Sequence, residues 1–272
     1  VKSMNTALTE ALLSLSNQTD QQAQATQQDI KSLKNIAYGV IASDKPSEFK
    51  EPLKNIKSRL ENASKYNQQF IDILSELEKS EHVDLSNEIK QVKEANNSIN
   101  DNLKSTNQLI DALSNGSSGQ LEAVNVLRDL PNLNKRLDTL RNYIKKELNR
   151  NLLAVSNEIT DQLNKDQNTL STIQSKLNTI NRVINTGQDI LNSGKKRIDT
   201  IQTALPAIEN AYINAMRTAQ AYFPTAKKDV AKAADFVRND LPGLERELAN
   251  VTQSVNQKIP SLFSRYDNAV DL

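Results

Sequence analysis

Apolar side chains recur every three or four residues along most of the chain, which is the spacing of one face of an α-helix. The pattern opens at Leu8, Leu12 and Leu15 and resumes at Ile30 after a polar stretch over 16–29. Single thin helices are marginally stable in water, so each apolar stripe needs a partner helix. The sequence therefore predicts an all-α fold, an elongated antiparallel coiled coil or long helical bundle that forms a stalk.

Three breaks divide the helical pattern within residues 1–132. They lie near 43–52, 78–84 and 114–131. The first contains two prolines, which lack a backbone N–H and disfavour the helical conformation of the residue before them. The second is charged and ends at Asp84, a residue type that caps helices. The third contains Asn115-Gly-Ser-Ser-Gly119, a typical turn sequence, and Pro131, which suits the first turn of a helix.

Two interleaved series of residues, each with a seven-residue period, lie between the second and third breaks. They are Leu85, Val92, Ile99, Thr106 and Leu113, and Ile89, Asn96, Leu103 and Ile110. This periodicity predicts a coiled-coil seam with polar residues at Asn96 and Thr106.

One long heptad helix is predicted over 133–204. Its apolar positions include Leu133, Leu137, Leu140, Ile144, Leu148, Leu152, Val155, Ile159, Leu170, Ile173, Leu177, Ile180, Ile184, Leu191, Ile198 and Ile201. The four-residue steps from Leu140 to Leu152 are a stutter, which locally relaxes supercoiling. Gly187 and Gly194 occupy seam positions, where glycine indicates either the close approach of a partner side chain or backbone, or a flexible joint.

Residues 205–272 contain a repeat of 18 residues marked by proline. The prolines are Pro206, Pro224, Pro242 and Pro260. Eighteen residues make five helical turns, so the apolar face stays on one side of a straight helix. Either each proline begins a short helix, or one long helix is kinked at regular intervals, which the absence of Gly-rich turns favours. The chain stops within the fourth repeat, which suggests a fragment of a longer protein.

Composition and charge exclude several classes of protein. Apolar residues make up 37% of the 272 residues and aromatic residues only 4%, against about 45–50% apolar residues in globular chains. Lys and Arg number 34 and Asp and Glu 33, a balance that argues against a nucleic-acid partner. No apolar run reaches the length of a membrane helix and no signal peptide is evident, so any membrane anchor is expected outside this chain.

Residue types that carry chemistry are sparse, and the sequence predicts no catalytic, cofactor-binding or metal-binding residues. The chain has no Cys and one His, His82, in a charged break, where a solvated histidine is the simplest interpretation. Asp129 and Asp240 precede Leu-Pro, where a carboxylate typically caps a helix. Tyr212, Tyr222 and Tyr266 lie on or near the apolar face of the repeats, which indicates packing or, alternatively, ligand recognition. We expect a protein that is not an enzyme.

The C-terminal repeats carry a resemblance to a known family. The run Ala233-Ala-Asp-Phe-Val-Arg-Asn-Asp-Leu-Pro-Gly-Leu-Glu-Arg-Glu-Leu248, followed by Val255-Asn-Gln-Lys-Ile-Pro-Ser-Leu262, resembles the extracellular region of the YhgE/Pip (phage infection protein) family of Gram-positive bacteria. The specific match covers residues 200–272. The resemblance implies a polytopic membrane protein whose helical ectodomain lies between membrane segments. Some members of that family serve as bacteriophage receptors, and a related branch belongs to type VII secretion systems.

The resemblance implies a non-catalytic extracellular stalk at the cell membrane that presents a surface to protein partners, such as phage adsorption proteins or secretion components. It implies no cofactor, and it places both chain ends near the same end of the stalk. The breaks near 43–52, 78–84 and 114–131 are the candidate contact loops. The alternative is an intracellular or phage structural coiled coil that only scaffolds an assembly. The seams leave open whether they close within one chain or in a homodimer.

Overall fold

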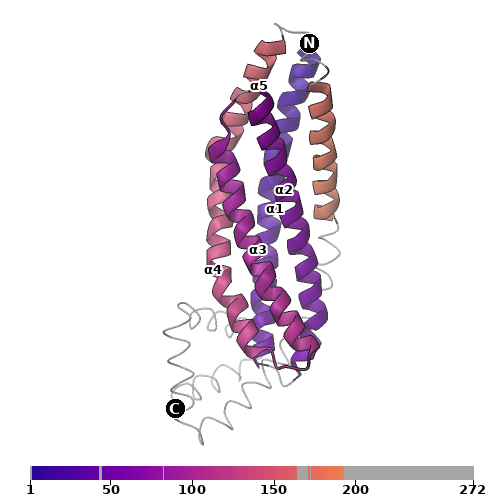
Figure 1. Cartoon of the computed structure of the whole chain (residues 1–272), viewed down its shortest axis with the longest axis vertical. Coiled ribbons are helices and arrows are strands. Elements are labelled where there is room, and N and C mark those ends of the chain that lie inside the picture. The colour runs from indigo at the N-terminus through magenta and orange to yellow at the C-terminus, as the bar shows by residue number, and fades with distance from the viewer. Residues whose placement is uncertain (1, 43–44, 82, 164–170, 172, 193–272) are drawn as a thin grey trace, which may run out of the picture. The chain divides into compact units, whose positions relative to one another are not determined.

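The computed structural model describes residues 2–42, 45–81, 83–163, 171 and 173–192, and helices account for nearly all of them (Figure 1). The named elements are α1 (Lys2–Ala42), the 3₁₀ turn η1 (Pro46–Phe49), α2 (Lys50–Glu81), α3 (Ser86–Ser114), α4 (Gln120–Tyr143), the π-helical turn η2 (Ile144–Leu148) and α5 (Asn149–Leu163). Residues 173–192 are helical as well, and no strand occurs in the described ranges. The prediction of an all-α helical bundle is confirmed. The elongated coiled-coil form stays a prediction.

The chain divides into two compact units. Unit 1 comprises Val1–Ser32, Asn55–Asn107 and Asp129–Asp199, and unit 2 comprises Leu33–Lys54, Gln108–Arg128 and Thr200–Leu272. Several helices therefore contribute to both units. Within the described ranges, no helix combines the length and the apolar content that a bilayer crossing requires.

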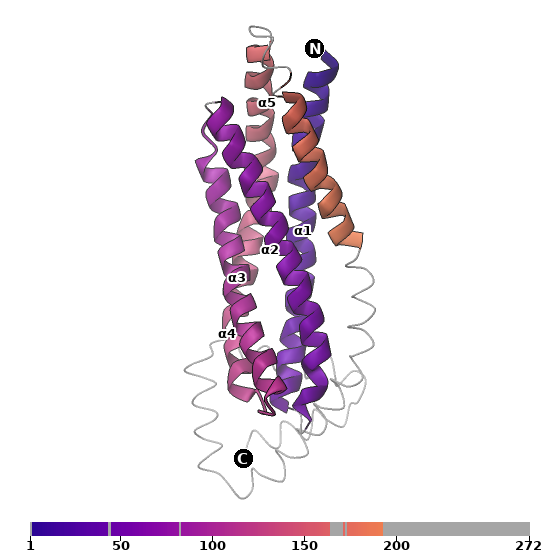
Figure 2. The ribbon, with the colours of Figure 1, turned by 45° about the vertical axis from the view of Figure 1, so that its right-hand side comes forward.

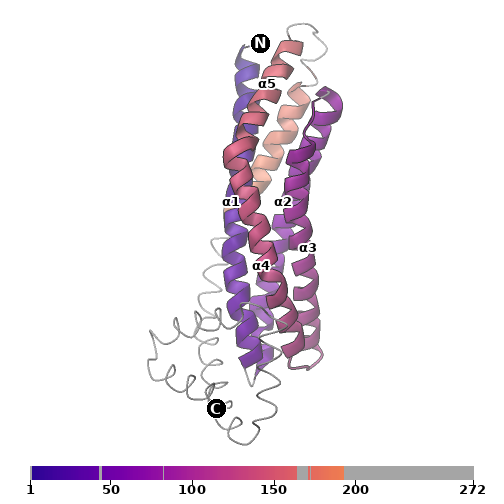
Figure 3. The same cartoon turned by 90° about the vertical axis from the view of Figure 1, so that its left-hand side faces the viewer.

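Hydrogen bonds between helices give their directions within unit 1. Along α1, Thr9 contacts Ser156, Asp20 accepts from Arg141 and Gln27 donates to Asp138. Residue numbers rise along α1 while those of the partners fall, so α1 runs opposite to α4 and α5 (Figure 3). The pairs Asn67–Asn96 and Ser64–Asn100 show the same relation between α2 and α3 (Figure 2).

The composition of the polar stretch 16–29 of α1 would indicate a solvent-facing surface. Several of its side chains are nevertheless buried. They are Ser16, Gln18, Thr19, Gln22, Thr26 and Asp29. Thr19 and Thr26 donate to backbone carbonyls four residues earlier in the same helix. Asp29 forms an ion pair with Arg59 of α2 at 2.5 Å, and both side chains are less than 10% exposed. Unit 1 therefore has a mixed polar and apolar interior.

Unit 2 contains two close approaches at glycine. A Cβ atom at Gly39 would lie 2.8 Å from the ring of Phe49, and one at Gly119 would lie 2.9 Å from Leu109 and Leu113. Gly116 and Gly119 both have positive φ angles, 80° and 67°, a conformation that glycine adopts at little cost. The predicted turn at 115–119 is confirmed.

The third predicted break is shorter than 114–131, because α4 begins at Gln120 and Pro131 lies inside it. The prediction that Pro131 occupies the first turn of a helix is therefore wrong. Ala123, Val126, Leu127, Leu130 and Leu133 are all buried. Burial of this continuous stripe outweighs the single backbone hydrogen bond that an exposed proline removes. The first break is also narrower than 43–52, since η1 begins at Pro46 and α2 at Lys50. The second break differs from 78–84 in the same way, since α2 continues to Glu81 and α3 begins at Ser86.

The predicted continuous helix over 133–204 is wrong. Gln18 and Gln22 of α1 donate to the carbonyls of Ile184 and Gly187, so the segment 173–192 runs in the same direction as α1. Because α5 runs opposite to α1, the chain reverses between α5 and this segment.

The repeats over 205–272, Gly194 and the relation between the two chain ends lie outside the described residues.

Candidate partner-binding site at the start of α3

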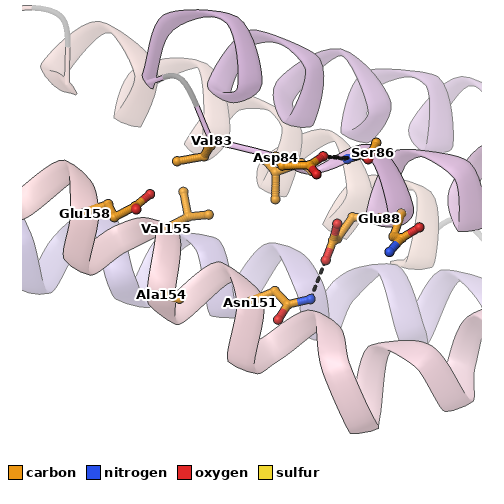
Figure 4. Close-up of a pocket in the computed structure, with 10 residues that line it drawn as sticks. Val83, Asp84, Ser86, Glu88, Asn151, Ala154, Val155 and Glu158 are labelled. Carbon is orange, nitrogen blue, oxygen red and sulfur yellow. Dashed lines mark hydrogen bonds between the residues drawn. The ribbon is translucent and has the colours of Figure 1, made fainter.

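One of the predicted contact loops, 78–84, borders a cleft of about 300 Å³ in unit 1 (Figure 4). The cleft lies between the connection from α2 to α3 and the outer face of α5. Its lining residues are Val83, Asp84, Leu85, Ser86, Asn87, Glu88, Asn151, Ala154, Val155 and Glu158. Three of the ten carry carboxylates and none is Lys or Arg, so the cleft is an acidic surface.

Asp84 fixes one wall of the cleft by capping α3. Its carboxylate accepts hydrogen bonds from the Ser86 backbone N–H at 3.0 Å and from the Ser86 hydroxyl at 2.5 Å. These hydrogen bonds lower the pKa of Asp84, because they stabilise its charged form. Glu78 accepts from the N–H of Leu85 at 2.8 Å. The predicted capping role of Asp84 is confirmed, and it orders the loop beside the cleft.

Glu88 forms the inner wall and is only 4% exposed. Its carboxylate accepts hydrogen bonds from the Tyr143 hydroxyl at 2.9 Å and from the Asn151 side-chain amide. Burial, followed by the hydrogen bond to Glu88 and the charge of Glu88, raises the pKa of Tyr143. Two neutral donors thus hold the buried Glu88 carboxylate in place and link α3 to the end of α4 and to α5.

The π-helical turn Ile144–Leu148 explains how both donors reach Glu88. Tyr143 and Asn151 are eight residues apart, which in a regular α-helix separates them by about 80° around the axis. A π turn accommodates about one extra residue, which brings them to within about 20° of the same face. The same turn absorbs the stutter from Leu140 to Leu152, whose steps would otherwise rotate the stripe by about 120°. The stutter was expected to relax supercoiling, and the helix instead takes it up in a single wide turn.

The cleft can accept hydrogen bonds and attract cationic groups. Its one hydroxyl, that of Ser86, donates to the Asp84 carboxylate as part of the α3 cap. In the described part of the chain, no group of three or more His, Cys, Asp or Glu side chains is arranged to hold a metal ion.

The remaining residues singled out in the sequence have different outcomes. Asp129 does not cap a helix, because it lies within α4, where it accepts a 2.5 Å hydrogen bond from Ser105. At Gly187 the close-approach interpretation is confirmed, since a Cβ atom there would lie 2.2 Å from Gln18 Oε1 and 2.6 Å from the Tyr66 ring. His82, Asp240, Tyr212, Tyr222 and Tyr266 lie outside the described residues.

Glu88, Tyr143 and Asn151 were not predicted from the sequence. These residues are far apart in the chain, and Tyr143 and Asn151 share a face only because of the π turn. The stutter was the one signal that pointed to this turn.

The described residues form an all-α helical bundle, and an acidic cleft lies in unit 1. Comparisons with protein-family models, with curated protein sequences and with solved structures found no match to this chain.

Proposed function

We propose that this chain is an extracellular helical stalk of a Gram-positive membrane protein similar to the YhgE/Pip family, with no catalytic role of its own. It presents a surface to protein partners, such as phage adsorption proteins or secretion components. The observation that carries the proposal is the resemblance of residues 233–248 and 255–262 to the extracellular region of that family.

The described structure supports a binding role in two ways. The chain forms long helices with few connections, which suits a scaffold that holds loops in place. One of those connections opens into an acidic cleft in which hydrogen bonds hold the carboxylates of Asp84 and Glu88. A partner with Lys or Arg side chains has the charge that this cleft attracts.

Adsorption assays on cells test the role of the cleft. Glu158 lines the cleft and takes no part in the cap of α3, so Glu158→Lys reverses a charge of the cleft and leaves the cap in place. We expect phage adsorption to fall by about tenfold, as for loss of a charge pair worth about 1.4 kcal/mol. Asp101→Lys, on the exposed face of α3, is the matched control and is expected to leave adsorption unchanged.

Scrambling the loops at 43–52, 78–84 and 114–119 one at a time extends the test to every candidate contact loop. Unchanged adsorption for Glu158→Lys and for all three scrambled loops contradicts the proposed contact surface.

The alternative, an intracellular or phage structural scaffold, differs in location. A membrane-impermeant amine reagent applied to intact cells labels the lysines of a surface stalk. A scaffold inside the cell is labelled only after lysis. The parent gene gives a second test, because only the stalk proposal requires apolar membrane helices on both sides of this chain.

A further inference from the structure

The helical segment 173–192 is held against the rest of unit 1 by an unusual combination of contacts. Four of its apolar side chains, Ile173, Leu177, Ile180 and Val183, are buried. Beyond Val183 the apolar side chains of Ile184, Ile190 and Leu191 are only half-buried, and no side chain from residue 188 to residue 192 is buried. Hydrophobic burial, together with the ion pair of Lys176 with Glu81 of α2, therefore anchors mainly the residues up to 183.

Polar contacts hold the second half. Gln18 Nε2 donates to the carbonyl of Ile184 at 2.8 Å, and Gln22 Nε2 donates to the carbonyl of Gly187 at 2.9 Å. Each such bond contributes about 0.5–1.5 kcal/mol net, because water replaces it when the surfaces separate. Gly187 adds no side chain to the interface and weakens the helix by about 1 kcal/mol relative to Ala.

An open cavity lies between part of this segment and α2. It has a volume of about 380 Å³, and Ile180 and Val183 line it together with Ile73 and Leu77 of α2. The exposed residues Asp72, Glu76, Thr179 and Arg182 also line it, so the cavity is open to water. Gln69 also lines this cavity, and its Oε1 atom is buried without a hydrogen-bond partner in the described structure.

We propose that segment 173–192 is a strap that opens from α1 and α2 while the other helices of unit 1 stay folded. The basis is that a segment opens locally when it has few buried apolar contacts and when water can replace its polar contacts. Opening frees the amides of Gln18 and Gln22 and uncovers the ring of Tyr66, which packs against Gly187. Figure 2 shows the strap, in orange, beside the upper part of α1.

Hydrogen exchange of the whole chain, followed by mass spectrometry, tests the strap. We expect backbone amides in 173–192 to exchange at least about tenfold faster than those of α2 within 55–81, because strap opening costs less than global unfolding. Equal exchange rates in the two regions would overturn the proposal.

Two substitutions are expected to change the exchange rate of the strap in opposite directions. Gln22→Ala removes one anchoring amide and is expected to speed exchange in 173–192 by about fivefold to tenfold. Gln69→Met removes the unpaired oxygen while keeping the side chain's length, and is expected to slow exchange there. Asn181→Ala, at an exposed position of the strap, is the control and is expected to change neither region.

Equal acceleration of α2 and the strap in Gln22→Ala would mean that the amide supports the whole bundle, and would also overturn the proposal. If Gln22→Ala fails to fold, the wild-type comparison and Gln69→Met decide the outcome.

Discussion

Individual buried polar residues fix the interior of unit 1. The ion pair of Asp29 and Arg59 links α1 to α2 in an interior that also contains Ile30 and Ile56. A buried pair of this kind contributes little net stability, because desolvation offsets the attraction, but removal of one partner leaves an uncompensated charge.

Removal of one charged partner is therefore expected to lower the free energy of unfolding more than replacement of both partners by apolar residues. Arg59→Met alone should lower the free energy of unfolding by about 3–5 kcal/mol, since Asp29 remains buried without its partner charge. Asp29→Leu combined with Arg59→Met should recover most of that loss. Urea denaturation followed by far-UV circular dichroism measures both. A double variant as unstable as the single one would show that the pair is intrinsically stabilising.

At Gly187, the sign of the change in stability on substitution by alanine distinguishes close packing from a flexible joint. Gly187→Ala should destabilise the protein by about 1–3 kcal/mol, as for overpacking of a filled site, because the new Cβ meets Gln18 and the Tyr66 ring. A glycine that served only as a flexible joint would give about 1 kcal/mol of stabilisation instead. Thermal unfolding, with Asn181→Ala as the exposed control, distinguishes the two outcomes.

At the scale of elements, the π turn Ile144–Leu148 is the feature that most affects the candidate site. Deletion of the exposed Lys146 should convert it to α-helix while keeping Tyr143 and Asn151 on one face, because the turn contains about one residue more than a regular turn. The melting temperature should therefore change little.

Deletion of the exposed Lys135, in the regular part of α4, is the matched control. It should rotate the residues on either side by about 100° relative to one another and misplace the buried stripe. Circular dichroism melts compare the two deletions. Equal damage from both would contradict the interpretation of the π turn.

The helices were predictable from sequence because their apolar stripes repeat over many turns, as in Leu53, Ile56, Leu60 and Leu74 of α2, all buried. The helix ends were less predictable. Pro131 signals a helix start locally, yet the stripe around it continues and determines the structure. The reversal between α5 and the segment 173–192 was not predicted, because Leu163 and Leu170 are seven residues apart and apolar residues at heptad spacing continue on both sides of them.

The candidate site was predictable only as a loop. The residue type and position of Asp84 predict a helix cap. Tertiary packing and the π turn at Ile144–Leu148 bring together Glu88, Tyr143 and Asn151. No local sequence pattern specifies this arrangement. The buried glutamines of α1 were also hidden, because their polarity resembles that of a solvated face.

At the scale of the whole molecule, the balanced charge of +1 leaves specific buried groups to set the pH dependence of stability. Burial raises the pKa of Tyr66, and its hydrogen bond to Thr19 acts in the opposite direction. The Tyr66 side chain is fully buried. In the unfolded chain a tyrosine titrates near about 10.

Stability should therefore be intact below about pH 10 and fall above it, since the unfolded chain releases the Tyr66 proton first. The loss from this residue approaches about 1.4 kcal/mol per pH unit. Tyr66→Phe should flatten the fall, because phenylalanine cannot ionise, while Thr19 keeps its bond to the Leu15 carbonyl. Urea denaturation at pH values from 8 to 11 measures the slope, and an unchanged slope in Tyr66→Phe would contradict this assignment.

The wide turn at Ile144–Leu148 also bears on how such a chain diverges over evolution. A single inserted codon normally displaces every downstream side chain of a helix, but a π turn of five residues such as this one can take up one extra residue and leave the packing beyond it in register. Homologous genes should accordingly differ by one codon at this point, some with it and some without, while the buried leucines on both sides keep the same partners.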